Sequence, residues 1–215
     1  MKRQEQSAAD QTGNMSAERR FRLLDPAEMS DAQRTLVAAI QSGPRGKVAG
    51  SAANSQTGTV GGPFNVFLRS PELGDYLQKA GSYVRFGCVL GNKLTELAIL
   101  VTARYWSAQY EWYAHHRLAL QAGLDPLIAE AIANGREPAG MDEQETAVYR
   151  FSRELHHDKQ VSDESFQAIV RMFGEQGVMD LIGVNGYYTV VSMVLNTDCT
   201  PIPEGVAPLP VLNGR

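Results

Sequence analysis

The stretch that decides the fold runs from Lys93 to Gly123, KLTELAILVTARYWSAQYEWYAHHRLALQAG. Its first half has apolar residues at the i, i+3, i+4, i+7 spacing of a buried helix face, and its other sides are apolar too. Its second half has the pattern of another helix, which begins after a turn near Trp106 and Ser107. The stretch therefore predicts two core helices that meet at this turn.

Three titratable side chains in this stretch are candidates for catalysis: Glu96, Glu111 and His115. Glu96 lies in the apolar first helix, where a buried carboxylate needs a partner or a raised pKa. Glu111 and His115 are four residues apart, so they lie on one face of the second helix. If both carboxylates share a dry pocket, desolvation and like-charge repulsion keep one of them protonated near neutral pH, which suits general acid/base chemistry. The alternative for Glu96 is a structural ion pair with an arginine such as Arg104, or with a neighbouring subunit.

Four further residues are candidates for binding a substrate. Arg85 could anchor a carboxylate, or form a structural ion pair. Tyr110 and Trp112 could contact a substrate, or pack in the core. His116 projects about 100° away from His115 on the helix, so we expect it behind the site or at an interface.

A metal centre is not expected from this pattern. The E-x-x-x-H spacing of Glu111 and His115 does not match a zinc-protease helix, and no further His or Cys lies near in the sequence. The second histidine pair, His156 and His157, lies among charged residues, and we expect it at a solvated helix end.

Composition indicates one soluble globular domain. The chain has 215 residues, of which 43% are hydrophobic and 20% are charged, enough for a sizeable core. The formal net charge is −4 and the basic residues are scattered, so nucleic acid is not an expected partner.

The cellular compartment of the protein is predicted from its cysteines and its apolar segments. Cys88 and Cys199 are far apart and form no CxxC or metal-binding pattern, which favours free thiols in a reducing cytoplasm. The polar N-terminus lacks the apolar centre of a secretion signal. The apolar segment 178–195 contains polar residues and glycines, so we expect a buried helix and no membrane span.

Helix-start signals recur along the chain, and no alternating strand pattern competes with them, so we predict an all-α fold. The helix that starts at Ser70–Pro71 is predicted to carry its apolar face on Leu73, Leu77, Ala80 and Val84. The other start signals are Ser30 with Gln33, Asp125–Pro126, Asp142 with Glu145, and Ser162.

The predicted domain organisation is simple. We expect a disordered tail over residues 1–21, a single domain over 22–205 and an extended tail over 206–215; Met15 is an alternative start to Met1. Residues 43–62 contain six glycines. A loop of this length is expected to be a mobile insertion or a substrate lid.

Three segments resemble the carboxymuconolactone decarboxylase family, which also includes the alkylhydroperoxidase D type proteins. They are GPFNVFLRSPELGD before the central helices, ELAILVTARYWSAQYEWYAHHRLALQAGL within them, and the late GEQGVMDLIGVNGYYTVVSMVLN. The similarity covers residues 22–205 apart from the glycine-rich loop. On this resemblance, Glu96 matches the family glutamate and His115 the family histidine.

The redox positions of that family are changed in this chain. Where the peroxidase branch has its two cysteines, this sequence has Ala108 and Glu111. Peroxide reduction of that type needs a thiolate and a resolving thiol. The sequence therefore resembles the cysteine-free, decarboxylase-like branch more closely.

The resemblance implies an alkylhydroperoxidase D-like helical bundle around a central antiparallel helix pair, assembled into trimers or hexamers with active sites near subunit contacts. It implies a decarboxylase or lyase that acts without a cofactor on a small carboxylated lactone or keto acid. Glu111 and Glu96 would exchange protons, His115 would relay them, and Arg85 would bind a carboxylate. The alternatives are a family-type peroxidase activity and a non-catalytic oligomeric binding protein.

Overall fold

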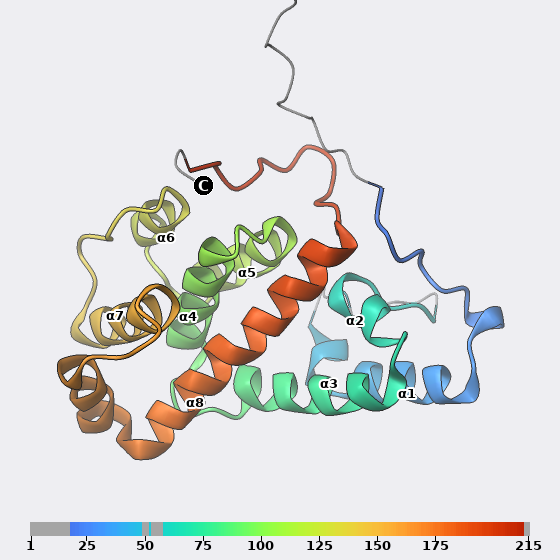
Figure 1. The fold of residues 1–215 in the computed structure, drawn as a ribbon, viewed down its shortest axis with the longest axis horizontal. Coiled ribbons are helices and arrows are strands. Elements are labelled where there is room, and N and C mark those ends of the chain that lie inside the picture. The colour runs from blue at the N-terminus through green and yellow to red at the C-terminus, as the bar shows by residue number, and fades with distance from the viewer. Residues whose placement is uncertain (1–17, 49–51, 53–57, 213–215) are drawn as a thin grey trace, which may run out of the picture.

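The computed structural model describes residues 18–48, 52 and 58–212, and all regular structure in these residues is helical (Figure 1). The predicted all-α class is therefore confirmed. The α-helices are α1 (Asp31–Ser42), α2 (Gly62–Phe67), α3 (Pro71–Phe86), α4 (Asn92–Tyr105), α5 (Gln109–Gln121), α6 (Pro126–Ala133), α7 (Glu143–His157) and α8 (Asp163–Asp198). Two short 3₁₀ helices are η1 (Pro26–Glu28) and η2 (Pro44–Lys47).

Helix α4 forms the centre of the molecule. It packs against α5, α7 and α8, and residues 97–100 have no exposed surface. The helix is therefore buried all round, as its sequence predicts. Figure 1 shows α8 crossing the molecule diagonally, with α3 and α1 on one side and α4 to α7 on the other.

The predicted helix starts are confirmed at their caps. Ser30 and Asp142 each form a complete capping box, and the Ser162 hydroxyl accepts a hydrogen bond from the Ser165 N–H. Helices α3 and α6 both carry proline in their first turn. These local contacts satisfy backbone N–H groups that have no partner inside the helix.

Helix α8 is kinked at a glycine and then continues. Its direction changes at Gly174, where φ is 70°, a left-handed conformation that glycine adopts without a steric penalty. By length and composition α8 could cross a membrane, but 56% of its most apolar stretch is buried inside the protein. The buried Asp180 on this helix accepts hydrogen bonds from the Tyr83 hydroxyl and the Val89 N–H. These features are consistent with a core helix of a soluble protein.

The ends of the described chain are bound more tightly than predicted. Residues 1–17 of the predicted tail lie outside the described residues, but the Arg20 N–H and the Phe21 N–H bind the end of α8 at Asp198. At the other end the chain is extended, yet Leu209 is buried and exchanges two hydrogen bonds with Gln109. The expected tails of residues 1–21 and 206–215 thus include residues 20, 21 and 209, which form hydrogen bonds with the helices.

The glycine-rich segment 43–62 is described only in part. Its first residues form η2, and Gly62 opens α2. The prediction of a mobile insertion or lid falls largely on residues 49–51 and 53–57, which lie outside the described residues.

The predicted apolar face of α3 is wrong at Leu73 and Ala80, which are both exposed. Leu73 is 55% exposed, and the buried residues are Gly74, Gln78, Gly81 and Val84. The two glycines allow close approach: the Phe67 carbonyl lies 2.8 Å from an ideal Cβ position at Gly74. Close packing therefore decides which face of α3 turns inward.

His156 also differs from its prediction, because it is buried rather than solvated. Its Nε2 lies 2.9 Å from the Thr102 hydroxyl, and its ring stacks on Tyr105 at 4.9 Å between centroids. Thr102 in turn binds Asn185, which links α4, α7 and α8. A polar network at the junction of three helices thus replaces the expected solvated helix end.

This burial predicts an acid-sensitive stability. Burial lowers the pKa of His156 to about 4, from the ordinary histidine value of 6.5. Because the unfolded state binds the proton more tightly, the free energy of unfolding should fall as pH drops from 6.5 towards 4, by about 3 kcal/mol from this group. Urea denaturation at several pH values should show a shallower decline in His156→Gln than in the wild type. The exposed neighbour variant His157→Gln should keep the wild-type decline, and equal slopes in all three proteins would contradict the assignment.

Candidate functional site

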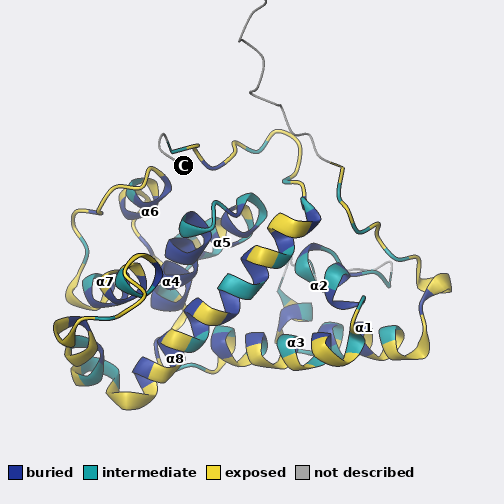
Figure 2. Ribbon diagram, in the orientation of Figure 1, coloured by how far each residue is buried: buried dark blue, intermediate teal, exposed yellow. Residues whose placement is uncertain are grey.

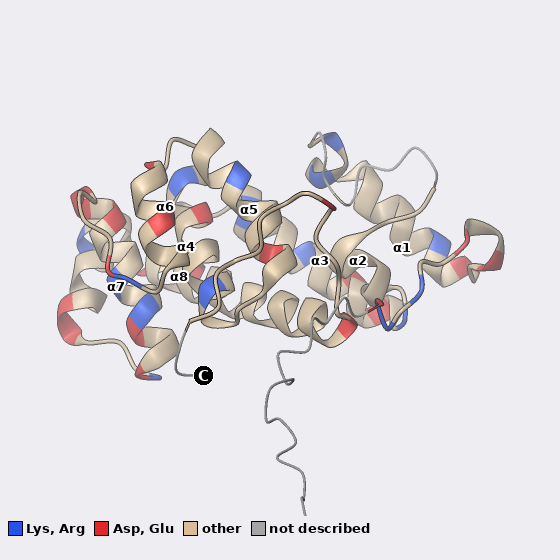
Figure 3. Ribbon diagram, turned by 90° about the horizontal axis from the view of Figure 1, so that it is seen from above, with Lys and Arg blue, Asp and Glu red and all other residues tan. Residues whose placement is uncertain are grey.

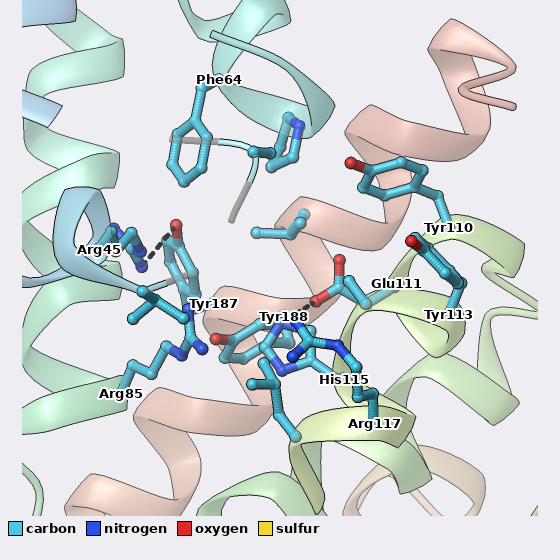
Figure 4. A pocket seen from close by; sticks show the side chains of 16 residues that line it. Arg45, Phe64, Arg85, Tyr110, Glu111, Tyr113, His115, Arg117, Tyr187 and Tyr188 are labelled. Atoms are coloured by element: carbon cyan, nitrogen blue, oxygen red, sulfur yellow. Dashed lines mark hydrogen bonds and ion pairs between the residues drawn. The ribbon is translucent and has the colours of Figure 1, made fainter. Parts of the chain in front are cut away.

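A cavity of about 80 Å³ lies between α5 and α8 on one side and η2, α2 and α3 on the other (Figure 4). It is larger than the roughly 10–15 Å³ that one water molecule requires. The residues that give it chemical character are Arg45, Phe64, Arg85, Tyr110, Glu111, Tyr113, His115, Arg117, Tyr187 and Tyr188.

Glu96, His115 and Glu111 form a continuous chain beside this cavity. His115 Nδ1 lies 2.6 Å from Glu96 Oε2, and His115 Nε2 lies 3.2 Å from Glu111 Oε1. The hairpin of α4 and α5 explains the first contact, since Glu96 is ten residues before Trp106 and His115 is nine residues after it. Helical spacing explains the second. The structure therefore brings the three predicted catalytic residues together.

The carboxyl group of Glu111 is the unusual member of this chain. Glu111 is 2% exposed and lines the cavity, and its Oε1 faces His115 Nε2 at 3.2 Å. Burial raises the pKa of Glu111, the charge of Glu96 adds to the rise, and His115 opposes it. A buried carboxyl of this kind favours its protonated form.

The arrangement also assigns the hydrogens of the imidazole. The short contact to Glu96 indicates that Nδ1–H of His115 donates to that carboxylate, since an ionised carboxylate only accepts hydrogen bonds. Nε2 then faces Glu111 and can accept or return a proton. In this arrangement Glu111 is the acid, His115 is its partner, and the carboxylate of Glu96 orients the imidazole of His115.

Arg85 forms the structural ion pair that was one of its two expected roles, and the binding of a substrate carboxylate stays a prediction. It lines the cavity, and its Nε lies 3.8 Å from Glu96 Oε1. Arg104, the other arginine considered as a partner of Glu96, instead donates to the backbone carbonyls of Ala133 and Pro210. Glu96 is thus held by His115 and Arg85.

Arg45 and Tyr187 were not predicted from the sequence. Arg45 lies on η2, is 5% exposed, and donates to the Gln78 carbonyl and towards the Tyr187 hydroxyl at 3.5 Å. Both side chains lie against Gly81, where an ideal Cβ would be 2.1 Å from Tyr187 and 2.4 Å from Arg45. An arginine within the glycine-rich segment 43–62 was the available signal in the sequence, but its partner Tyr187 lies 142 residues away.

Tyr188 was also missed. It is 3% exposed, lines the cavity and packs edge-on against His115 with 4.9 Å between ring centroids. Burial raises its pKa well above the ordinary tyrosine value, and the charges of Glu96 and Glu111 add to this. The sequence showed only a tyrosine pair in an apolar helix.

The other predicted binding residues divide into two groups. Tyr110 lines the cavity, whereas Trp112 and His116 are not among its lining residues. These two stack on each other at 5.6 Å, and Trp112 belongs to the hydrophobic core. Their helical positions turn them away from the face that carries Glu111 and His115. Within one protomer Trp112 therefore packs in the core and His116 lies outside the cavity wall, and a role of either in substrate binding stays a prediction.

The cavity has neither the donor set of a metal site nor that of a thiol site. His115 directs its two nitrogens at different carboxylates, and no group of three His, Cys, Asp or Glu residues in the described ranges could hold a metal ion. Cys88 contacts the Thr95 hydroxyl at 3.1 Å, and neither Cys88 nor Cys199 lines the cavity.

Comparison of this chain with models of known protein families finds no match, and comparison with curated proteins finds no significant match either.

Proposed function

We propose that the protein is a decarboxylase-like lyase that works by acid/base chemistry on a small carboxylated lactone or keto acid, without a cofactor. The observation that carries the proposal is the chain Glu96–His115–Glu111, which ends in a buried carboxyl group that lines the cavity. General acid/base groups need to lie within hydrogen-bond reach of one another and of the reacting atoms.

The proposed reaction begins with loss of CO₂ from the substrate carboxylate. The electrons of the broken carbon–carbon bond stay on carbon and spread onto a neighbouring carbonyl as an enolate. Glu111 gives its proton to that carbon, and one proton from solvent, relayed through His115, restores the acid. Glu96 stabilises the imidazolium that forms in the relay. One proton is consumed for each CO₂ released.

The charge of the cavity supports an anionic substrate. Arg45, Arg85 and Arg117 line it, and Glu111 is the one carboxyl among the lining residues that the structure describes. The whole chain has a formal charge of −4, and Figure 3 shows acidic and basic residues interspersed over its helices. Positive charge is therefore concentrated where a substrate carboxylate would bind, which favours a small anion over nucleic acid as the partner.

The family assignment is part of this proposal. The quoted segments that resemble carboxymuconolactone decarboxylases supply α2 with the start of α3, the hairpin of α4 and α5, and the second half of α8. Those elements provide most of the cavity wall. A peroxidase of the alkylhydroperoxidase D type is disfavoured, since Ala108 and Glu111 occupy its redox positions. We place the protein in the cytoplasm on the basis of its free thiols.

The proposal is tested by screening purified protein against lactone and keto-acid carboxylates, with detection of CO₂ and of the product mass. We expect release of CO₂ from at least one of them, with no requirement for added metal. A parallel assay with organic hydroperoxide tests the redox alternative. Peroxide consumption that is abolished by Cys88→Ser and unaffected by Glu111→Gln would contradict the proposal.

We also propose that a second copy of the chain covers an exposed apolar face, as the family resemblance implies for a trimer or hexamer. Figure 2 shows exposed bands along α8. Monomers rarely leave large apolar patches uncovered. The apolar residues of α3 and α8 that are at least 41% exposed are Leu73, Tyr76, Tyr83, Phe86, Met179, Ile182 and Met193.

Light scattering at micromolar concentration should therefore show an oligomer, and Ile182→Lys should shift it to smaller species because the charge would be buried in the contact. Leu127→Lys is the matched control, since Leu127 is 70% exposed on α6, away from this face. A monomeric wild type would contradict the assembly.

A further inference from the structure

We infer that Tyr188 is a further catalytic residue of this site, whose hydroxyl donates a hydrogen bond to the enolate oxygen formed when CO₂ leaves. The role presupposes the proposed function and deepens it. Glu111 and His115 can supply a proton to carbon, but the negative charge on oxygen also requires a donor. Fixed donors aimed at a developing oxyanion are among the largest contributions to catalysis in such sites.

The position of Tyr188 is fixed by perpendicular ring contacts. Its ring lies edge-on to His115, at 4.9 Å and 79°, and edge-on to Tyr187, at 5.2 Å and 89°. Figure 4 shows its hydroxyl directed towards the side of the cavity where Arg85 lies. The phenol of Tyr188 is therefore held between His115 of the acid/base chain and the side of the cavity where Arg85 lies.

The hydroxyl of Tyr188 is available to a ligand. No atom of the described residues forms a hydrogen bond with it, although the side chain is 3% exposed. The hydroxyl oxygen is not among the fully enclosed atoms that lack a partner, so water or a ligand in the cavity can accept its hydrogen bond. Glu111 lines the same cavity, and its Oε1 lies 3.2 Å from His115 Nε2. One ligand with a proton-accepting carbon and a nearby oxyanion would face both residues.

The protonation of Tyr188 suits a donor. Burial raises its pKa well above the ordinary value, the charges of Glu96 and Glu111 add to the rise, and Arg85 opposes it. The phenol thus stays neutral at physiological pH and keeps its hydrogen. Tyr187 differs, because its hydroxyl already lies 3.5 Å from Arg45 Nη2.

The test uses 4-nitrophenolate as an oxyanion probe, because its visible absorption reports the ionised oxygen. Titration at mildly alkaline pH should show saturable binding to the wild type. Tyr188→Phe, which keeps the ring, should weaken that binding roughly tenfold to a hundredfold, the effect of losing one hydrogen bond to a charged group. The matched control is Tyr149→Phe, a buried tyrosine of α7 outside the cavity, which should bind as the wild type does.

Several outcomes would overturn the role of Tyr188: no saturable binding by the wild type, an unchanged affinity in Tyr188→Phe, or an equal loss in Tyr149→Phe. Melting curves of each variant verify that the fold is retained. The probe assay does not involve CO₂ release. Failure of the proposed function would therefore appear in the substrate screen, and failure of the Tyr188 assignment would appear in the binding titration.

Discussion

Replacing Glu111 with glutamine is expected to lower turnover by about 10²–10⁴-fold, the usual contribution of a positioned acid or base. Glutamine has the shape of the protonated carboxyl but cannot give up a proton as an acid. The loss should lie in kcat, because the side chain still fills its place in the cavity wall. The measurement is steady-state kinetics on the substrate that the CO₂ screen identifies.

The same variant has an expected signature in stability. Because burial raises the pKa of Glu111 in the folded state, the native protein holds this proton more tightly than the unfolded chain does. The wild type should therefore lose stability as pH rises above 4.5 through the raised pKa, whereas Glu111→Gln should not. The stability of the variant relative to the wild type should increase over this pH range in urea denaturation. Turnover by the wild type should also fall as pH rises through this pKa, since the acid form is lost.

Glu145→Gln is the matched control. Glu145 is also a buried carboxyl in the first turn of its helix, but it pairs with Lys93 at 2.9 Å and does not line the cavity. Glutamine can keep the capping box, so this variant should lose the ion pair and leave turnover unchanged. If both variants lost stability at every pH and Glu111→Gln kept its turnover, Glu111 would be a structural residue.

Replacing Gly81 with alanine is expected to damage both the fold and the cavity. The added methyl group would lie 2.1 Å from Tyr187 Cζ and 2.4 Å from Arg45 Nη2, so both side chains must move. Overpacking of this kind lowers stability by about 1–3 kcal/mol. Displacement of Arg45 should also weaken the binding of an anion in the cavity. Urea denaturation and the 4-nitrophenolate titration measure the two effects.

Gly186→Ala and a double variant serve as controls. Gly186 is an exposed glycine of α8 with nothing within 4 Å of its ideal Cβ position, so alanine there should stabilise the helix by up to about 1 kcal/mol. Shortening Tyr187 to leucine should make room for the methyl group at residue 81. The double variant should therefore be more stable than the sum of the single effects predicts. Strict additivity would show that Gly81 and Tyr187 do not share this space.

The sequence alone was sufficient for features that depend on neighbours within about one helical turn. The caps at Ser30, Asp142 and Ser162 are confirmed because a side chain and the N–H groups it satisfies are close in sequence. The burial of α4 follows from its own composition. The contact between Glu96 and His115 follows from the short turn between α4 and α5. Glu96 is ten residues before Trp106 and His115 is nine residues after it, so the two antiparallel helices place them side by side.

Only the tertiary structure decided which faces turn inward and what completes the cavity. Leu73 is exposed because glycines on another face of α3 permit closer packing. His156 is buried because α4, α7 and α8 pack together around it, although its neighbours in the sequence are charged. Arg45 on η2 and Tyr188 on α8 line the same cavity as Glu111 and His115, although both are far from α5 in the sequence. Helical periodicity describes one helix at a time, whereas a cavity wall depends on how separate helices pack. The Lys93–Gly123 stretch thus determined the acid/base chain, and packing determined the arginine and tyrosine groups around it.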